Sequence, residues 1–279
     1  MLFAAPAVLP ALMTPFDDAD RIDRGALRDH VEFVIEAGVD GILPCGTTGE
    51  TALLEPDEVL EVVETVIEAA AGRVKVIAHV GRPSTRATQR LIERAIAAGA
   101  DGVAAILPYY YKLDDAHIVA HFRALLETAG ETPLLAYQFP ARTGNDLTPD
   151  ALATLAGHGL AGLKDSTGDR ERHAEYLAAA PGIEIFVGQP SLLLGSLRAG
   201  SRGSVAALGN LCPDKIVALV RAFAEGRAEE AERVQAELAA LEREMTTGPM
   251  LVGLKRAVSE AMAQRGARYP AAPRRPLSS

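Results

Sequence analysis

The chain has 279 residues, of which 48% are hydrophobic and 23% are charged, and this composition is ordinary for a soluble globular protein. Its formal net charge of −9 argues against a nucleic-acid partner, because binding phosphates requires a basic surface. No apolar run reaches the roughly 18 residues of a membrane span, and two cysteines are too few for a disulfide framework. We therefore expect a cytoplasmic protein with no membrane partner.

Short apolar runs alternate with longer amphipathic runs along the whole chain. The apolar start, residues 1–18, lacks a basic segment and contains several prolines, so it predicts a first strand and not a signal peptide. The longer runs have helical spacing, and several end at a glycine suited to a left-handed C-cap, as at Gly38. Eight apolar runs are predicted strands: 7–13, 39–45, 73–79, 102–108, 133–139, 160–164, 183–188 and 202–207.

Eight strands that alternate with helices imply parallel pairing, and eight such units close into a barrel. We predict an α/β fold, a (β/α)8 TIM barrel over residues 1–224 with a C-terminal helical extension over residues 225–279. Two helices are expected in the extension, at 226–244 and 249–264, followed by a proline-rich, loosely held tail. An open doubly wound sheet is the alternative, but no glycine-rich dinucleotide fingerprint follows the first strand.

The active site of such a barrel lies at the carboxyl ends of its strands. Strand two is followed by "CGTTGE", whose backbone N–H groups and hydroxyls suit an anion. Strand four is followed by "PYYYK", and strand five carries Tyr137 and is followed by "PARTG". Glycine turns and tyrosines at strand ends are often purely structural, so each motif alone is a weak signal.

Lys164 ends a strand that is otherwise apolar, "LAGLK". On the predicted strand Gly162 lies on the same face and leaves space beside the lysine stem. Burial disfavours the charged form of an amine, and the resulting free amine attacks carbonyls to form a Schiff base. Tyr137, one strand earlier, is suited to shuttle the protons. The alternative is a lysine whose head group reaches solvent, and the other lysines, such as Lys255 on a predicted helix, lack this setting.

With these residues in place the sequence resembles a known family, the pyruvate-dependent class I aldolases typified by dihydrodipicolinate synthase and N-acetylneuraminate lyase. The resemblance covers about residues 7–265 and rests on four motifs in order: "GTTGE", "YY", "Y-x-x-P-x-R-T-G" and "G-L-K-D". It implies a barrel with C-terminal helices, a homotetramer built as a dimer of dimers, and no metal or organic cofactor.

The resemblance also implies catalytic roles. Lys164 matches the lysine that forms the imine with pyruvate, and Tyr137 matches the tyrosine that handles protons. Thr47 matches the threonine that links this tyrosine by hydrogen bonds to a tyrosine from a neighbouring subunit, here Tyr110. These four residues are the predicted catalytic group.

Substrate-binding roles follow from the same resemblance. Thr48 matches the residue that holds the pyruvate carboxylate, with backbone amides such as that of Gly46 helping. Arg142 matches the arginine that meets the carboxylate of the second substrate in dihydrodipicolinate synthase. Val205 lies where a carbonyl of strand eight faces the site.

Three functions stay open at this point. The first condenses pyruvate with aspartate semialdehyde, which Arg142 favours. The second is an aldolase or dehydratase acting on a 2-keto-3-deoxy sugar acid, which Gln189 and Pro190 favour. The third is a catalytically silent barrel that binds a keto acid. We predict no metal site, because His117 and His121 have helical i, i+4 spacing but lack a third ligand.

Overall fold

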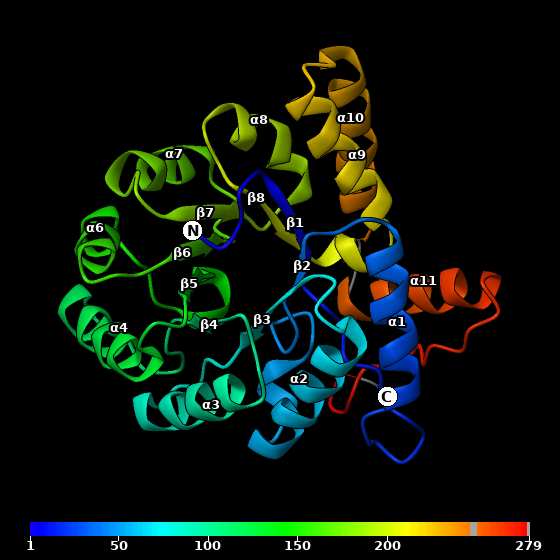
Figure 1. The fold of residues 1–279 in the computed structure, drawn as a ribbon, viewed down its shortest axis with the longest axis horizontal. Coiled ribbons are helices and arrows are strands. Elements are labelled where there is room, and N and C mark those ends of the chain that lie inside the picture. Colours follow the sequence, from blue (N-terminus) through cyan, green and yellow to red (C-terminus); the bar gives the residue numbers. More distant parts are fainter. Residues whose placement is uncertain (246–249, 278–279) are drawn as a thin grey trace.

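The computed structural model describes residues 1–245 and 250–277, and its strands form a parallel sheet in the order β1-β8-β7-β6-β5-β4-β3-β2. β1 and β2 approach each other through the bridge between Ala11 and Leu43, so the sheet closes into a barrel (Figure 1). The strands are β1 Ala7–Pro10, β2 Gly41–Ile42, β3 Lys75–His79, β4 Gly102–Ile106, β5 Leu134–Gln138, β6 Gly162–Asp165, β7 Glu184–Val187 and β8 Gly203–Ala206. Each falls inside or within one residue of a predicted run, and the predicted barrel is confirmed.

Helices surround this ring of strands (Figure 1). Several begin at a side-chain cap, as at Asp23, Ser84 and Asp114, where an oxygen accepts an orphan backbone N–H. The α-helices are α1 Arg24–Glu36, α2 Pro56–Ala70, α3 Thr85–Ala97, α4 Asp115–Ala129, α5 Pro140–Thr143, α6 Pro149–Gly157, α7 Arg170–Ala179, α8 Leu193–Arg198, α9 Pro213–Ala224, α10 Ala228–Met245 and α11 Met250–Gln264. Short 3₁₀ turns are η1 Thr51–Leu53, η2 Pro190–Leu192 and η3 Ala207–Asn210.

Two apolar layers stabilise the barrel. Alternate side chains of the strands fill its interior, including Leu9, Ile77, Leu135 and Phe186, while the larger cluster packs the opposite faces of the strands against the helices. Gly162 belongs to the inner layer, but it does not leave room beside the lysine stem as expected. A Cβ there would lie 2.5 Å from the Glu184 carbonyl oxygen, so the glycine serves the close approach of β6 and β7.

The C-terminal helices lie outside the ring, with α10 packed against α9 and η2 (Figure 1). The prediction of a loosely held tail is wrong for residues 269–277, and its last two residues, 278–279, lie outside the described part of the chain. Tyr269 is only 2% exposed, and Arg274, whose side chain is 11% exposed, forms an ion pair with Glu58 of α2. The prolines correctly indicated a backbone without helix or strand. Such a backbone is nevertheless well fixed when its side chains are buried or form ion pairs, as those of Tyr269 and Arg274 do.

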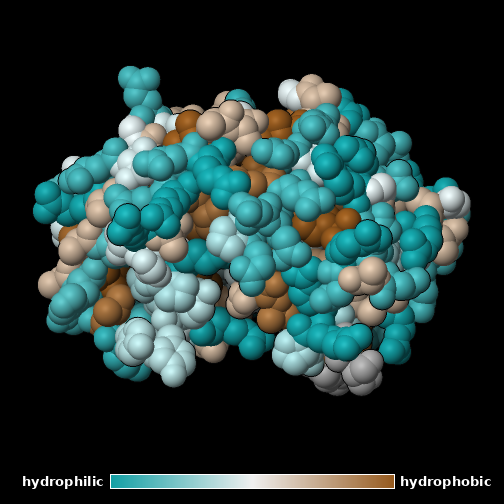
Figure 2. Space-filling model, turned by 90° about the horizontal axis from the view of Figure 1, so that it is seen from below, coloured by the Kyte–Doolittle hydropathy of each residue, from teal (hydrophilic) through white to brown (hydrophobic). Residues whose placement is uncertain are grey.

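One face of the molecule is mainly hydrophilic, with hydrophobic residues emerging in separate small groups (Figure 2). Scattered apolar residues of this kind are normal on a protein surface. Among the residues that the structure describes, no helix is both long and apolar enough to cross a membrane.

Candidate active site

A cavity of about 120 Å³ lies beside the carboxyl ends of the barrel strands. Lys164 lies in this cavity. The walls are formed by the ends of strands β5, β6 and β8, by the loops that follow β2, β5, β6, β7 and β8, and by the C-terminal helices. The lining residues are Thr47, Thr48, Tyr137, Phe139, Lys164, Ser166, Gly188, Gln189, Pro190, Val205, Ala207, Leu208, Glu242, Met245, Met250 and Leu254.

Lys164 is a buried amine without an acidic partner. It is 3% exposed, and no carboxylate in the described part of the chain lies within ion-pairing distance of its Nζ. Its nearest aromatic contact is the ring of Tyr137, whose centroid lies 4.1 Å from Nζ. Burial therefore lowers the pKa of Lys164 to about 7, so that a large share of the amine is unprotonated near neutral pH.

The pairing of β5 with β6 sets Tyr137 directly opposite Lys164. The Tyr137 hydroxyl shares a hydrogen bond of 3.1 Å with the Thr47 hydroxyl. Burial raises the pKa of Tyr137 to about 12, so the phenol keeps its proton at neutral pH and is able to donate it. The sequence prediction that Lys164, Tyr137 and Thr47 come together thus agrees with the geometry.

The loop after β2 brings Thr48 to the cavity wall. Gly46 is buried just behind it and does not line the cavity; its carbonyl accepts a hydrogen bond from the Thr51 N–H. Thr14 donates its hydroxyl proton to the Gly49 carbonyl at 2.9 Å. The first bond closes the loop on itself, and the second ties it to the residues that follow β1.

Two other predicted binding residues differ in how deeply they are buried. Val205 is buried and lines the cavity from β8. Arg142 lies in α5 and is exposed, with its guanidinium carbon 5.8 Å from the ring centroid of Phe139, which does line the cavity. Arg142 thus stands at the rim of the site and not in its floor.

Tyr110 is not part of the cavity formed by this single chain. Its side chain is 87% exposed, and its ring contacts that of the neighbouring Tyr111, with ring centroids 5.1 Å apart. Its backbone has φ +83°, a conformation that is uncommon for a residue with a side chain. An exposed aromatic on a strained backbone is a feature that a contact with another subunit would explain.

Sequence reasoning missed a whole wall of the site. Glu242, Met245, Met250 and Leu254 line the cavity from α10 and α11, and nothing in their local pattern pointed to this. Phe139 and Ser166 were also missed, although they stand only two residues after Tyr137 and Lys164, which were singled out. Their position just after β5 and β6 would have indicated them, because side chains at the carboxyl ends of barrel strands lie near the site.

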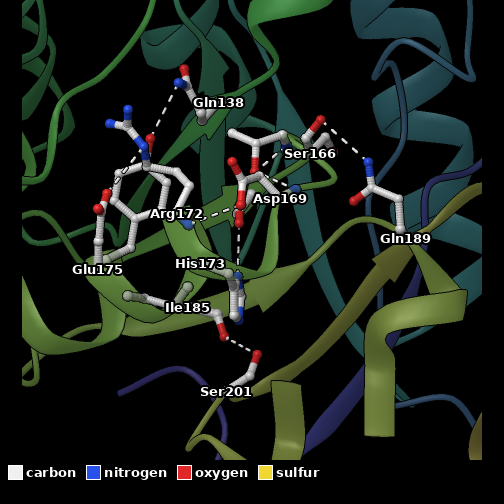
Figure 3. A network of polar contacts seen from close by, with 12 residues as sticks. Gln138, Ser166, Asp169, Arg172, His173, Glu175, Ile185, Gln189 and Ser201 are labelled. Atoms are coloured by element: carbon white, nitrogen blue, oxygen red, sulfur yellow. Dashed lines mark hydrogen bonds and ion pairs between the residues drawn. The ribbon is translucent and has the colours of Figure 1, made fainter. Parts of the chain in front are cut away.

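Behind β6 lies a polar network (Figure 3). Asp165 directly follows Lys164 in the chain. Its carboxylate accepts a hydrogen bond of 2.8 Å from the Nδ1–H of the buried His173. The Gln189 amide donates to the Ser166 carbonyl at 3.3 Å (Figure 3). Gln138 donates to the Tyr176 hydroxyl at 3.2 Å. The network fixes the ends of β5 and β6, which carry the two central site residues.

No metal site is formed by the residues that the structure describes, since no three His, Cys, Asp or Glu side chains are placed to hold an ion. His117 is exposed and contacts Asp114, whereas His121 is buried and bonded to Thr85 at 2.8 Å. Each histidine therefore has a local hydrogen-bond partner, Asp114 for His117 and Thr85 for His121.

The chain matches proteins of one family along nearly its whole length. The sequence profile of the Dihydrodipicolinate synthetase family matches residues 5–279. The 4-hydroxy-tetrahydrodipicolinate synthase of Natronomonas pharaonis is 40% identical over 239 residues, which cover 85% of this chain and 81% of that protein. A DapA-like lyase of Halobacterium salinarum is 38% identical over 252 residues, which cover 90% of this chain and 83% of that protein.

Solved structures agree. The dihydrodipicolinate synthase of Aquifex aeolicus has a TM-score of 0.90 at 29% identity, covering 98% of this chain and 92% of that one. YagE, a prophage protein of the dihydrodipicolinic acid synthase family from E. coli K12 in complex with pyruvate, has a TM-score of 0.92 at 27% identity, covering 99% and 93%. The resemblance drawn from the motifs is confirmed: this chain belongs to the dihydrodipicolinate synthetase family and is a lyase.

Proposed function

We propose that this lyase forms a Schiff base between Lys164 and pyruvate, or a related 2-keto acid, and uses it for aldol condensation or cleavage. The observation that carries the proposal is the unpaired, buried amine of Lys164 beside the protonated phenol of Tyr137. A free amine at neutral pH is the nucleophile that this chemistry needs. The pyruvate complex of YagE, a relative in fold and sequence, supports the same ligand here.

In the proposed mechanism the Lys164 amine attacks the C2 carbonyl of pyruvate. Tyr137 donates a proton to the departing hydroxyl, and water leaves as the protonated imine forms. The imine draws electrons from C3, and the C3 proton passes to the Tyr137 phenolate left by the first step. The resulting enamine adds to the carbonyl carbon of an aldehyde, whose oxygen takes that proton back from Tyr137. Thr48 and the backbone near Gly46 hold the pyruvate carboxylate, and the carbonyl of Val205 faces the bound substrate. Hydrolysis of the imine then releases the product and restores Lys164.

For the aldehyde we favour aspartate semialdehyde, because Arg142 at the rim is placed to meet a carboxylate that extends out of the cavity. A 2-keto-3-deoxy sugar acid is the second candidate. It is favoured by Gln189, a lining residue of the cavity whose buried Oε1 has no hydrogen-bond partner among the described residues and suits a sugar hydroxyl. Turnover with each substrate distinguishes the two.

The test is reduction with borohydride in the presence of pyruvate, followed by peptide mass spectrometry. The expected result is one pyruvyl adduct, located on Lys164, while Lys255 stays unmodified as an internal control. If no adduct forms with pyruvate or with a related 2-keto acid, or if it forms on another lysine, the proposed function is wrong. A silent keto-acid-binding barrel would bind pyruvate and show no turnover with either aldehyde.

We further propose a cytoplasmic homotetramer, built as a dimer of dimers, in which residues 1–224 form the barrel and residues 225–279 the extension. In this arrangement Tyr110 reaches the Thr47–Tyr137 pair of a neighbouring subunit. The test mixes two inactive variants, Lys164→Ala and Tyr110→Phe, under conditions that exchange subunits. Mixed oligomers should regain part of the activity, because some sites then contain both native residues. A monomer in sedimentation, or no regain, would contradict this assembly.

A further inference from the structure

The loop that carries Thr47 and Thr48 has a strained backbone at both ends. Cys45 has φ +59° and Glu50 has φ +62°, both in the left-handed region that residues with side chains rarely occupy. Strained conformations of this kind persist only where surrounding contacts hold them. The contacts of Glu50 are therefore informative about what shapes the loop.

Glu50 is held from the far end of the chain. Its fully buried carboxylate forms an ion pair with Lys255 of α11, whose side chain is also fully buried. The second carboxylate oxygen accepts a hydrogen bond of 2.8 Å from the backbone N–H of Arg274. A buried carboxylate with these two partners cannot move without leaving a buried charge unpaired.

Lys255 connects this ion pair to the tail and to the cavity. Its amine also lies 3.3 Å from the Ala272 carbonyl and 4.6 Å from the ring centroid of Phe16. The preceding residue, Leu254, lines the active-site cavity. One helix turn thus contacts the loop, the tail and the site together.

Arg274 fastens the segment that follows Glu50. Its Nη1 donates to the Leu53 carbonyl at 2.9 Å, and its two terminal nitrogens contact both carboxylate oxygens of Glu58 at 2.6 Å. Its guanidinium carbon lies 4.4 Å from the ring centroid of Phe16. A bidentate pair of this kind fixes geometry as well as adding stability.

We propose that Lys255 and residues 269–274 form a C-terminal strap, and that the strap positions Thr47 and Thr48 by holding Glu50. Its members are positioning residues, since none of them is among the residues that line the cavity. The roles of Thr47 and Thr48 rest on the proposed function. The strap itself rests only on the contacts described above, so the two are open to separate tests.

The first measurement is hydrogen exchange of the loop, read by mass spectrometry on peptides that span residues 43–54. In Lys255→Met and in Arg274→Ala we expect this peptide to exchange at least tenfold faster than in the unaltered protein, while peptides of β4 and α4 do not change. Arg268→Ala is the matched control, because Arg268 directly precedes the strap and, among the described residues, its ion pair is with Asp23, with its own side chain exposed. Unchanged exchange of residues 43–54 in both strap variants would overturn the proposal, whether or not the protein forms a pyruvate adduct.

The second measurement asks whether the strap acts through Thr47. Lys255→Met should slow the trapping of pyruvate at least tenfold in the native background and less than twofold when Thr47 is already Val. A merely structural role would give equal factors in both backgrounds, however far the melting temperature falls. If Lys255→Met does not fold, Arg274→Ala and the charge-free pair Glu50→Gln with Lys255→Met take its place in the same cycle.

Discussion

Two lysines are buried in this protein, and their surroundings make them chemically different. Lys164 is 3% exposed at the end of β6, beside the cavity, and has no acidic partner in the part of the chain that the structure describes. Lys255 is 0% exposed in α11 and is paired with Glu50. Burial lowers the pKa of both amines, but at Lys255 the carboxylate of Glu50 opposes that effect. Burial alone therefore does not make an amine reactive, and the missing counter-ion is what frees Lys164.

The largest effect is expected from Lys164→Ala. It removes the nucleophile, so adduct formation should be lost and turnover should fall by at least about 1,000-fold, because no other group replaces a covalent nucleophile. Circular dichroism should show an unchanged fold, since a buried unpaired amine is replaced by an apolar group. Adduct formation on Lys255 in this variant would break the comparison, because it would mean that a paired amine also reacts.

Lys255→Met should lower the stability of the protein as well as slow the trapping of pyruvate. It leaves the Glu50 carboxylate buried without its cation, a change that typically costs about 3–5 kcal/mol of unfolding free energy. Urea denaturation measures the loss, and replacing both partners, Glu50→Gln with Lys255→Met, should recover a large part of it. A single variant as stable as the unaltered protein would show that the ion pair contributes nothing.

The pH dependence should distinguish the two amines as well. The rate of pyruvate trapping should rise with pH through a midpoint near 7, the pKa of Lys164, since only the free amine attacks. In the unfolded chain this lysine keeps its ordinary pKa of 10.5, so the unfolded state holds the extra proton between these values. The group therefore makes the unfolding free energy increase from about pH 7 toward pH 10, and Lys164→Met should remove that increase. A midpoint of the trapping rate near pH 10 would contradict the conclusion that burial lowers the pKa of Lys164.

The smallest effect is expected at the rim. Arg142→Ala should raise KM for an acceptor that carries a carboxylate by roughly tenfold, as the loss of one charge-assisted contact does. KM for pyruvate should change by less than twofold, because Thr48 and not Arg142 lines the inner cavity. Arg170→Ala, another exposed arginine on the surface, is the control. Equal effects on both substrates would refute the assignment.

Local patterns in the sequence determined the eight-stranded barrel and the central site. Strands and helices are each stabilised by one buried face, and that face is visible as periodicity in the chain. Lys164 stood out because an amine at the end of an apolar strand is costly unless it has a role. Since parallel strands end on the same edge of a barrel, Tyr137 and Thr47 could be placed beside it by topology alone.

Only the tertiary structure decided the remaining features. The pocket wall from α10 and α11, and the pairing of Glu50 with Lys255, join residues about 200 positions apart. Lys255 had the appearance of an ordinary helix lysine, and the tail had the composition of a loose segment. The burial of Lys255 and of the tail depends on contacts with distant parts of the chain. Such contacts leave no periodic pattern of hydrophobic residues in the local sequence.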